Sequence, residues 1–168
     1  MKVLVTGGAG FIGSHIVVRL LQEGHDVTVV DNLCSGKRKN VPRAAQFYKM
    51  DVESAKLVRV FRNERPSIVM HPAAQMNVRK SVDDPLFDAQ VNVLGTLNVL
   101  EQAAKHRARK VIFSSSGGAI YGEQNDFPAT ESHVTQPLSP YGISKLCGEH
   151  YLSYYARMSG IQVVSLRY

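Results

Sequence analysis

Tryptophan is missing from this chain of 168 residues, and cysteine occurs only twice. Cys34 and Cys147 have neither the spacing of metal ligands nor that of a redox pair, so we expect reduced thiols and no disulfide framework. The six histidines form no His-x-x-x-His arrangement, and the chain has no Cys-x-x-Cys motif. Both absences argue against a metal site.

Long apolar runs are also missing. No stretch approaches the roughly 20 residues that a membrane-spanning helix needs. Met1 and Lys2 lead directly into an apolar strand, and not into the hydrophobic region of a secretory signal. We therefore expect a cytoplasmic protein that does not insert into a membrane.

Acidic residues are fewer than basic ones, 14 against 20, which gives a formal net charge of +6. The basic residues are dispersed, and the run Lys37, Arg38 and Lys39 lacks the interleaved aromatic side chains that stack on bases. An anionic small ligand explains the positive sign equally well. We therefore expect no nucleic-acid partner.

A glycine-rich turn follows the first apolar segment. Residues 3–5 are typical of a buried parallel strand, and Gly7, Gly10 and Gly13 allow a tight turn whose backbone approaches phosphate oxygens closely. Apolar residues then recur at helical spacing, at Ile16, Val17, Leu20 and Leu21. The N-terminus of that helix directs free N–H groups at the turn, which predicts a bound anion there.

A second strand, near residues 27–30, ends at Asp31. An acidic side chain at this place accepts hydrogen bonds from an adenosine ribose and repels a 2′-phosphate. The strand, turn, helix, strand and acid together predict a dinucleotide site that prefers NAD. The basic run at Lys37, Arg38 and Lys39 keeps NADP as the alternative.

Strand and helix patterns alternate along the whole chain. This alternation predicts a single α/β domain over residues 1–168, a Rossmann-type doubly wound parallel sheet with helices on both faces. The expected strands lie near residues 2–6, 27–30, 46–49, 67–71, 110–114 and 161–167. The expected helices lie near residues 12–23, 54–63, 86–106 and 140–158, and the expected loops at 32–43, 117–128 and 133–139.

A tyrosine and a lysine lie four residues apart near the start of the last helix. Ser139 and Pro140 fit an N-cap and a first helical position, so Tyr141 and Lys145 share one face. A nearby ammonium group favours the phenolate and lowers the phenol pKa. Tyr141 would then act as a general base, and a serine after the fifth strand would hold the reacting oxygen. The alternative is an ordinary surface pair.

Four motifs carry a resemblance to a known family. They are residues 6–13 (TGGAGFIG), 71–75 (HPAAQ), 114–116 (SSS) and 141–145 (YGISK). Together they resemble the extended short-chain dehydrogenase/reductase superfamily, and within it the NAD-dependent epimerase/dehydratase family. Residues 31–36, 78–81 and 84–85 are similar to the UDP-glucose 4-epimerase subgroup. The resemblance covers this chain but only the N-terminal half of a typical member, so we expect the substrate-binding domain outside residues 1–168.

The resemblance implies that NAD lies along the carboxyl edge of the sheet. The residues implied for the pyrophosphate are Gly7, Gly10, Phe11, Ile12 and Gly13. Those implied around the adenosine are Asp31, Asn32, Leu33, Cys34, Ser35, Gly36, Asp51 and Val52. Those implied along the middle of the cofactor and its nicotinamide ribose are Ala73, Ala74, Gln75, Asn92, Tyr141 and Lys145. Alternatively, the apolar members are core residues and the two asparagines are turn or packing amides.

The resemblance also implies a catalytic set of Ser116, Tyr141 and Lys145, with Ser115 as the alternative serine. The implied reaction is epimerisation of a UDP-sugar, in which hydride leaves C4 and returns to the opposite face. Related dehydratases place an acid between the serine and the following Tyr-Gly pair, and residues 117–120 contain none. Glu123 keeps a dehydratase or decarboxylase open, and a catalytically inactive NAD-binding module is the further alternative.

Two of the expected helices carry apolar residues on more than one stripe. These residues are Leu94, Leu97, Leu100, Tyr151, Leu152, Tyr154 and Tyr155. Core packing explains such a pattern, but related enzymes form dimers through the equivalent helices. We therefore expect a homodimer.

Overall fold

The computed structural model describes residues 1–124 and 127–168. Six parallel strands form one sheet in the order β3-β2-β1-β4-β5-β6. The strands are Lys2–Thr6 (β1), Asp26–Asp31 (β2), Gln46–Lys49 (β3), Ile68–His71 (β4), Lys110–Ser115 (β5) and Gln162–Arg167 (β6). The strand order reverses at β1, which lies between β2 and β4, and ligands of such sheets bind at the carboxyl ends beside this point. The predicted fold class is confirmed.

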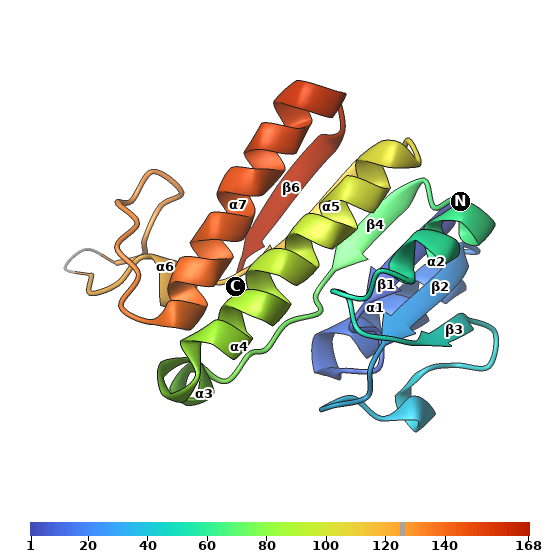
Figure 1. Cartoon of the computed structure of the whole chain (residues 1–168), viewed down its shortest axis with the longest axis horizontal. Coiled ribbons are helices and arrows are strands. Elements are labelled where there is room, and N and C mark those ends of the chain that lie inside the picture. The colour runs from blue at the N-terminus through green and yellow to red at the C-terminus, as the bar shows by residue number, and fades with distance from the viewer. Residues whose placement is uncertain (125–126) are drawn as a thin grey trace.

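Helices cover both faces of the sheet (Figure 1). They are Phe11–Gln22 (α1), Leu57–Glu64 (α2), Val78–Asp83 (α3), Pro85–Ala89 (α4), Gly95–Lys105 (α5), Gly117–Ile120 (α6) and Pro140–Ser159 (α7). A short 3-10 turn, Arg38–Asn40 (η1), and a π-helical segment, Gln90–Leu94 (η2), complete the set. In Figure 1, α5 and α7 lie side by side over β4, β5 and β6.

Alternation along β1 distributes its side chains between two cores. Val3 and Val5 pack with Val17 of α1 on one face. Leu4 packs with residues of α2, α5 and α7 on the other face, where Phe61 is fully buried. A strand buried on both faces reads as a continuous apolar run, which is why residues 3–5 identify it in the sequence.

The capping of α7 follows its sequence. The Ser139 hydroxyl accepts a hydrogen bond from the Gly142 amide at 3.2 Å, and Pro140 occupies the first turn. Gly160 ends the helix in the left-handed region with φ of 71°. The predicted N-cap is therefore confirmed, and it fixes the start of α7 and with it the position of Tyr141 in the first turn.

Three segments differ from the sequence-based expectations. The single helix expected at 86–106 is α4, η2 and α5 in succession, with the π-helical segment in the middle. Residues 78–83 form α3, and residues 117–120 of the expected 117–128 loop form α6. Residues 125 and 126 of that loop lie outside the described residues. These are short elements whose packing on α7, and not their periodicity, determines them.

In the part of the chain that the structure describes, no helix combines the length and apolar character needed to cross a membrane. Among the same residues, His, Cys, Asp and Glu form no group of three that could hold a metal ion.

Candidate active site

Three glycines shape the turn between β1 and α1. Gly7 has φ of +64°, and a Cβ there would lie 2.8 Å from the Ala73 amide nitrogen. A Cβ on Gly13 would lie 2.1 Å from the Gly7 carbonyl oxygen. At Gly10 a Cβ would meet only the Gly7 oxygen, at 3.3 Å. Gly7 and Gly13 are therefore required by backbone packing, whereas Gly10 borders open space.

The first turn of α1 is not capped by a side chain. Gly10 is the N-cap, and the first turn contains no acidic residue. A cleft of about 500 Å³ opens here between α1 and the segment after β2. Phe11 is 83% exposed and Ile12 is 42% exposed, which excludes a core role for both. The helix N-terminus therefore presents N–H groups and a positive dipole end to an accessible cleft, as a pyrophosphate requires.

Asp31 organises the loop that borders this cleft. Its buried carboxylate accepts hydrogen bonds from the Ala9 amide at 2.9 Å and the Leu33 amide at 2.8 Å. Each oxygen keeps a further lone pair for a ligand hydroxyl. Asp31 therefore fits the predicted ribose-binding role and also fixes the glycine turn.

Most of the remaining predicted adenosine residues lie in the same loop, whereas Asp51 and Val52 follow β3. Asn32 accepts a hydrogen bond from the Cys34 amide and donates one to Asp51 at 2.6 Å. A Cβ on Gly36 would lie 2.8 Å from the Ala9 carbonyl carbon, so this loop packs directly on the turn. Val52 is 6% exposed and belongs to the main core, in agreement with the alternative interpretation as a core residue.

A histidine at the end of β4 is part of a buried hydrogen-bonded chain. The Thr96 hydroxyl donates to the Asn92 carbonyl and accepts from His71 Nε2 at 3.1 Å. Nδ1 of His71 then accepts from the Thr6 hydroxyl at 2.6 Å, and Thr6 accepts from the Ala73 amide. Burial lowers the pKa of His71 to about 3, and the charge of Lys145 adds to this effect. His71 is thus a neutral structural residue.

A buried amide fixes the segment after β4. Asn92 accepts from the Gln75 amide and donates to the Gln75 carbonyl, both at 2.9 Å. Its second donor contact is with Asp88 Oδ1, also at 2.9 Å. Asn92 is therefore a packing amide in this structure, and it holds Gln75 at the edge where the cofactor is expected.

Tyr141 and Lys145 meet at the carboxyl end of β5. Lys145 is 3% exposed and its Nζ donates to the Ser114 carbonyl at 2.9 Å. Nζ also lies 5.7 Å from the centre of the Tyr141 ring. Burial lowers the pKa of Lys145 to about 8, and the charge of Asp88 opposes this shift. The structure thus brings the predicted tyrosine and lysine together with the serine-containing end of β5.

The expectation of an acidic phenol is wrong for the protein without its cofactor. Burial raises the pKa of Tyr141, the negative charge of Asp88 adds to the rise, and the Ser116 hydroxyl lowers it through a hydrogen-bonding interaction. The sequence reasoning included the ammonium group of Lys145 but neither the burial nor the acid. This interaction brings the Ser116 hydroxyl close to the phenol.

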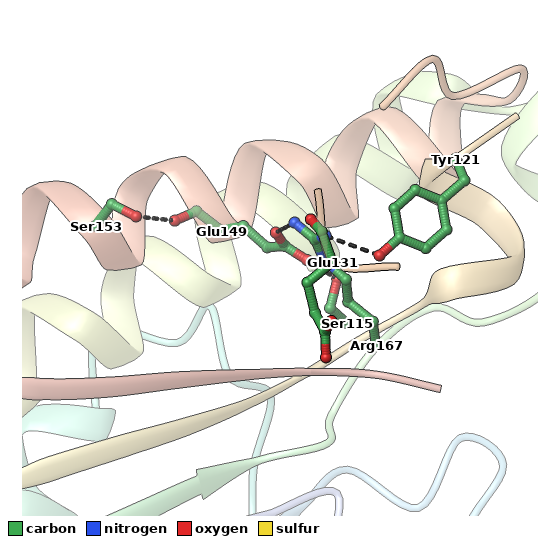
Figure 2. A network of polar contacts seen from close by, with 6 residues as sticks. All are labelled: Ser115, Tyr121, Glu131, Glu149, Ser153 and Arg167. Carbon is green, nitrogen blue, oxygen red and sulfur yellow. Dashed lines mark hydrogen bonds and ion pairs between the residues drawn. The ribbon is translucent and has the colours of Figure 1, made fainter. Parts of the chain in front are cut away.

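Ser115 faces a different set of groups, shown in Figure 2. Its hydroxyl donates to Glu149 Oε1 at 2.5 Å, and Arg167 binds both oxygens of the same carboxylate at 3.1 and 2.7 Å. Arg167 also donates to the Tyr121 hydroxyl at 2.8 Å. The Ser115 hydroxyl is therefore engaged in joining β5, β6 and α7, which favours Ser116 as the candidate serine.

Comparison with known proteins gives the family. The sequence profile of the NAD dependent epimerase/dehydratase family matches residues 3–168. The chain belongs to this family. The chain is also similar to a UDP-glucose 4-epimerase of Mycolicibacterium smegmatis, with 44% identity over 163 residues, or 94% of this chain and 52% of that protein.

Solved structures of the epimerase/dehydratase family agree with the fold. A Thermus thermophilus UDP-glucose 4-epimerase in complex with NAD has a TM-score of 0.97 and 51% identity, covering 100% of this chain and 55% of that one. A Thermotoga maritima UDP-glucose 4-epimerase with UDP-glucose has a TM-score of 0.98 and 48% identity, with 100% and 55% covered. The chain spans about half the length of these relatives.

Sequence reasoning missed Asp88 and Ser144. The Ser144 hydroxyl donates to Asp88 Oδ2 at 2.7 Å, and both residues are buried. A signal was present, because Asp88 precedes Asn92 by one helical turn and Ser144 directly precedes Lys145. Neither spacing alone separates such a pair from ordinary helix residues.

The depressed pKa of His71 predicts acid sensitivity. In the unfolded chain a histidine binds a proton below its ordinary pKa of 6.5, whereas folded His71 does so only near 3. Between these values the unfolded state holds the extra proton, so the free energy of unfolding should fall by about 1.4 kcal/mol per pH unit as pH decreases. Urea denaturation between pH 7 and pH 5 measures this slope.

A His71→Gln variant should show a shallower pH slope, and exposed His15→Gln should keep the slope of the parent. If the parent and the His71 variant have the same slope, His71 does not carry the acid sensitivity.

Proposed function

We propose that this chain is the NAD-binding part of a UDP-sugar 4-epimerase, and specifically of a UDP-glucose 4-epimerase. The observation that carries this proposal is the meeting of Ser116, Tyr141 and buried Lys145 at the carboxyl end of β5. Family membership and the two UDP-glucose 4-epimerase structures support the same activity.

The site fits NAD because it combines an uncapped helix N-terminus, open space at Gly10 and the carboxylate of Asp31 at the end of β2. The residues that would hold the pyrophosphate and adenosine are Gly7, Gly10, Phe11, Ile12, Gly13, Asp31, Asn32, Leu33, Cys34, Ser35, Gly36 and Asp51, and Val52 would support Asp51 from the core. Those nearer the nicotinamide would be Ala73, Ala74, Gln75, Tyr141 and Lys145, with Asn92 holding Gln75 in place. When bound, oxidised NAD supplies a hydride acceptor and a positive charge that favours the Tyr141 phenolate.

The chain's own residues divide the work at the sugar C4 hydroxyl. The Tyr141 phenolate oxygen takes the hydroxyl proton as hydride leaves the same carbon, and it returns the proton in the second half of the reaction. The Ser116 hydroxyl holds the reacting oxygen. The Lys145 ammonium, fixed by the Ser114 carbonyl, stabilises the phenolate and binds the nicotinamide ribose.

A dehydratase or decarboxylase is the weaker candidate. Residues 117–120 lie between Ser116 and Tyr121 and contain no carboxylate, and Glu123 is exposed. A second acid–base group is therefore missing from the described residues next to the serine. A non-catalytic NAD-binding chain is the remaining alternative, since this chain spans about half the length of its relatives.

The test is an assay of the complete polypeptide that carries this chain, with UDP-galactose and catalytic NAD. UDP-glucose formed without net NADH supports the epimerase. A keto-deoxy sugar as product, or a pentose formed with release of CO₂ from a UDP-uronic acid offered in a parallel assay, would support the rival enzymes instead. Bound NAD with no product would identify a non-catalytic chain.

We also propose a homodimer through α5, α7 and their neighbours. Leu94 is 57% exposed, Tyr154 is 48% exposed and Leu86 is 82% exposed. Leu100 and Leu152, from the same apolar stripes, are buried in the core, in agreement with the core-packing interpretation for these two. Light scattering should give twice the chain mass of 18.5 kDa, and a monomeric mass at micromolar concentration would contradict the dimer.

A further inference from the structure

Asp88 is a fully buried acid at the junction of three segments. Its exposed fraction is 0%. Oδ1 accepts from Gln75 Nε2 at 3.0 Å and from Asn92 Nδ2 at 2.9 Å, and Oδ2 accepts from the Ser144 hydroxyl at 2.7 Å. The carboxylate thus joins the segment after β4, the π-helical segment η2 and α7.

The backbone fixes which atoms of the two amides point at Asp88. The backbone N–H of Gln75 donates to Asn92 Oδ1, and the backbone N–H of Asn77 donates to Gln75 Oε1 at 2.7 Å. A backbone N–H only donates, so the side-chain atom that accepts from it must be the oxygen of Asn92 or Gln75, and the NH₂ group of each side chain lies on the opposite side. Both side-chain amides therefore direct their NH₂ donors at Asp88.

These contacts indicate the charge state of Asp88. Both carboxylate oxygens accept hydrogen bonds, and none of their partners requires a proton from the acid. Such an acceptor-only environment favours the ionised form. A buried negative charge is costly unless a positive charge lies close by.

Lys145 is the positive group that matches it. Lys145 directly follows Ser144 on α7, and its ammonium group is nearly inaccessible to water. The ammonium group of Lys145 lies 5.7 Å from the centre of the Tyr141 ring on α7. Its charge lowers the pKa of His71 at the end of β4, and the charge of Asp88 on α4 raises the pKa of Lys145 itself. His71 is neutral near pH 7 and Tyr141 keeps its proton, so Asp88 supplies the opposite charge.

We propose that Asp88 is a positioning residue of the cofactor site: its carboxylate is the counter-charge of Lys145 and ties Gln75 and Ser144 into one rigid edge. The catalytic meaning of this assignment rests on the proposed function. Asp88 acts through Lys145, Gln75 and Asn92, and it has two opposite effects on the reaction. It keeps Lys145 protonated, and it also disfavours the Tyr141 phenolate.

The direct test is the Asp88→Asn variant, which keeps the size of the side chain and removes the charge. The Lys145 titration midpoint, followed by NMR of ¹³C,¹⁵N-lysine and assigned with Lys145→Arg, should fall by about one pH unit or more from its value of about 8. The Tyr141 midpoint should fall as well, because the repulsion from Asp88 is lost. A merely structural role predicts no such paired shift.

Two controls separate charge from packing. Asp83→Asn removes an exposed carboxylate at the end of α3 and should leave both midpoints in place. Ser144→Ala removes one hydrogen bond to Asp88 but keeps its charge, so the Lys145 midpoint should move much less than in Asp88→Asn. Unchanged midpoints in folded Asp88→Asn would overturn the proposal.

A measurement on the unaltered chain covers the case in which Asp88→Asn does not fold. The ¹³C shift of the Asp88 carboxyl should report an ionised group at pH 7 and should respond again as Lys145 loses its proton. A protonated Asp88, or one that is insensitive to Lys145, would overturn the proposal.

The NAD dissociation constant from calorimetry provides a separate measurement. It should rise about tenfold in Asp88→Asn, which corresponds to about 1.4 kcal/mol. A parent chain that shows the paired titration but binds no NAD would disprove the proposed function and leave the charge pairing intact. An unchanged constant in Asp88→Asn would overturn the link to the cofactor site.

Discussion

Replacing Gly13 by alanine should lower the free energy of unfolding by at least about 3 kcal/mol. The new Cβ would lie 2.1 Å from the Gly7 oxygen and 2.8 Å from the Gly8 Cα, and both are backbone atoms. The turn cannot shift to relieve this clash, because the Gly7 N–H donates a hydrogen bond to the Val30 carbonyl at 2.8 Å and Gly7 packs against Ala73. Urea denaturation measures the loss.

Gly10→Ala is the matched control. Its Cβ would meet only the Gly7 oxygen, at 3.3 Å, and would otherwise enter the open space at the start of α1. We therefore expect a nearly unchanged free energy of unfolding and a dissociation constant for NAD raised about tenfold or more. If Gly10→Ala destabilises the fold as much as Gly13→Ala does, the space at Gly10 is not reserved for the cofactor.

Tyr141→Phe should lower epimerase turnover of the complete polypeptide by about 10²- to 10⁴-fold, the usual contribution of general acid–base catalysis. The aromatic ring remains in place without its hydroxyl, so the dissociation constant for NAD should change little. Conversion of UDP-galactose to UDP-glucose measures the first quantity and calorimetry the second.

Tyr154→Phe removes a hydroxyl from an exposed position on the same helix and should leave turnover unchanged. If the Tyr141→Phe variant retains turnover, Tyr141 is not the general base. Loss of turnover together with loss of NAD would instead indicate that the Tyr141 hydroxyl holds the cofactor edge.

The parts of the site that could be predicted are those encoded by neighbouring residues. A glycine turn, its flanking strand and helix, and the terminal acid Asp31 lie within one βαβ unit, so their spacing alone specifies the geometry. The same holds for Tyr141 and Lys145, which share a helix face because they are four residues apart.

The choice between the two serines shows what strand alternation adds. Val111, Phe113 and Ser115 are all buried and point to the same side of β5, toward the core beneath α7. Ser115 therefore meets Glu149, and Ser116, after the last strand residue, is free to approach Tyr141. The alternation of buried and less buried side chains along β5 could be read from the sequence, but the resemblance to the family motif does not depend on it.

The polarity around Tyr141 could not be predicted from the sequence. Its phenol pKa depends on how deeply the ring is buried and on the charge of Asp88, which is distant in the chain and comes close only through tertiary packing. A carboxylate on one helix and a tyrosine on another carry no local pattern that links them. Buried charges from separate elements are therefore the part of such a site that requires a structure.

The number of residues in the π-helical stretch Gln90–Leu94 determines how Asp88 is oriented relative to α5 and therefore matters for the candidate site. Each residue of an α-helix rotates the chain by about 100°, so removing one residue between the two α-helices α4 and α5 would swing Asp88 away from both Gln75 and Ser144 while α5 stayed anchored in the core. Small insertions and deletions in this stretch should therefore be more harmful than most substitutions, even though no residue would be replaced.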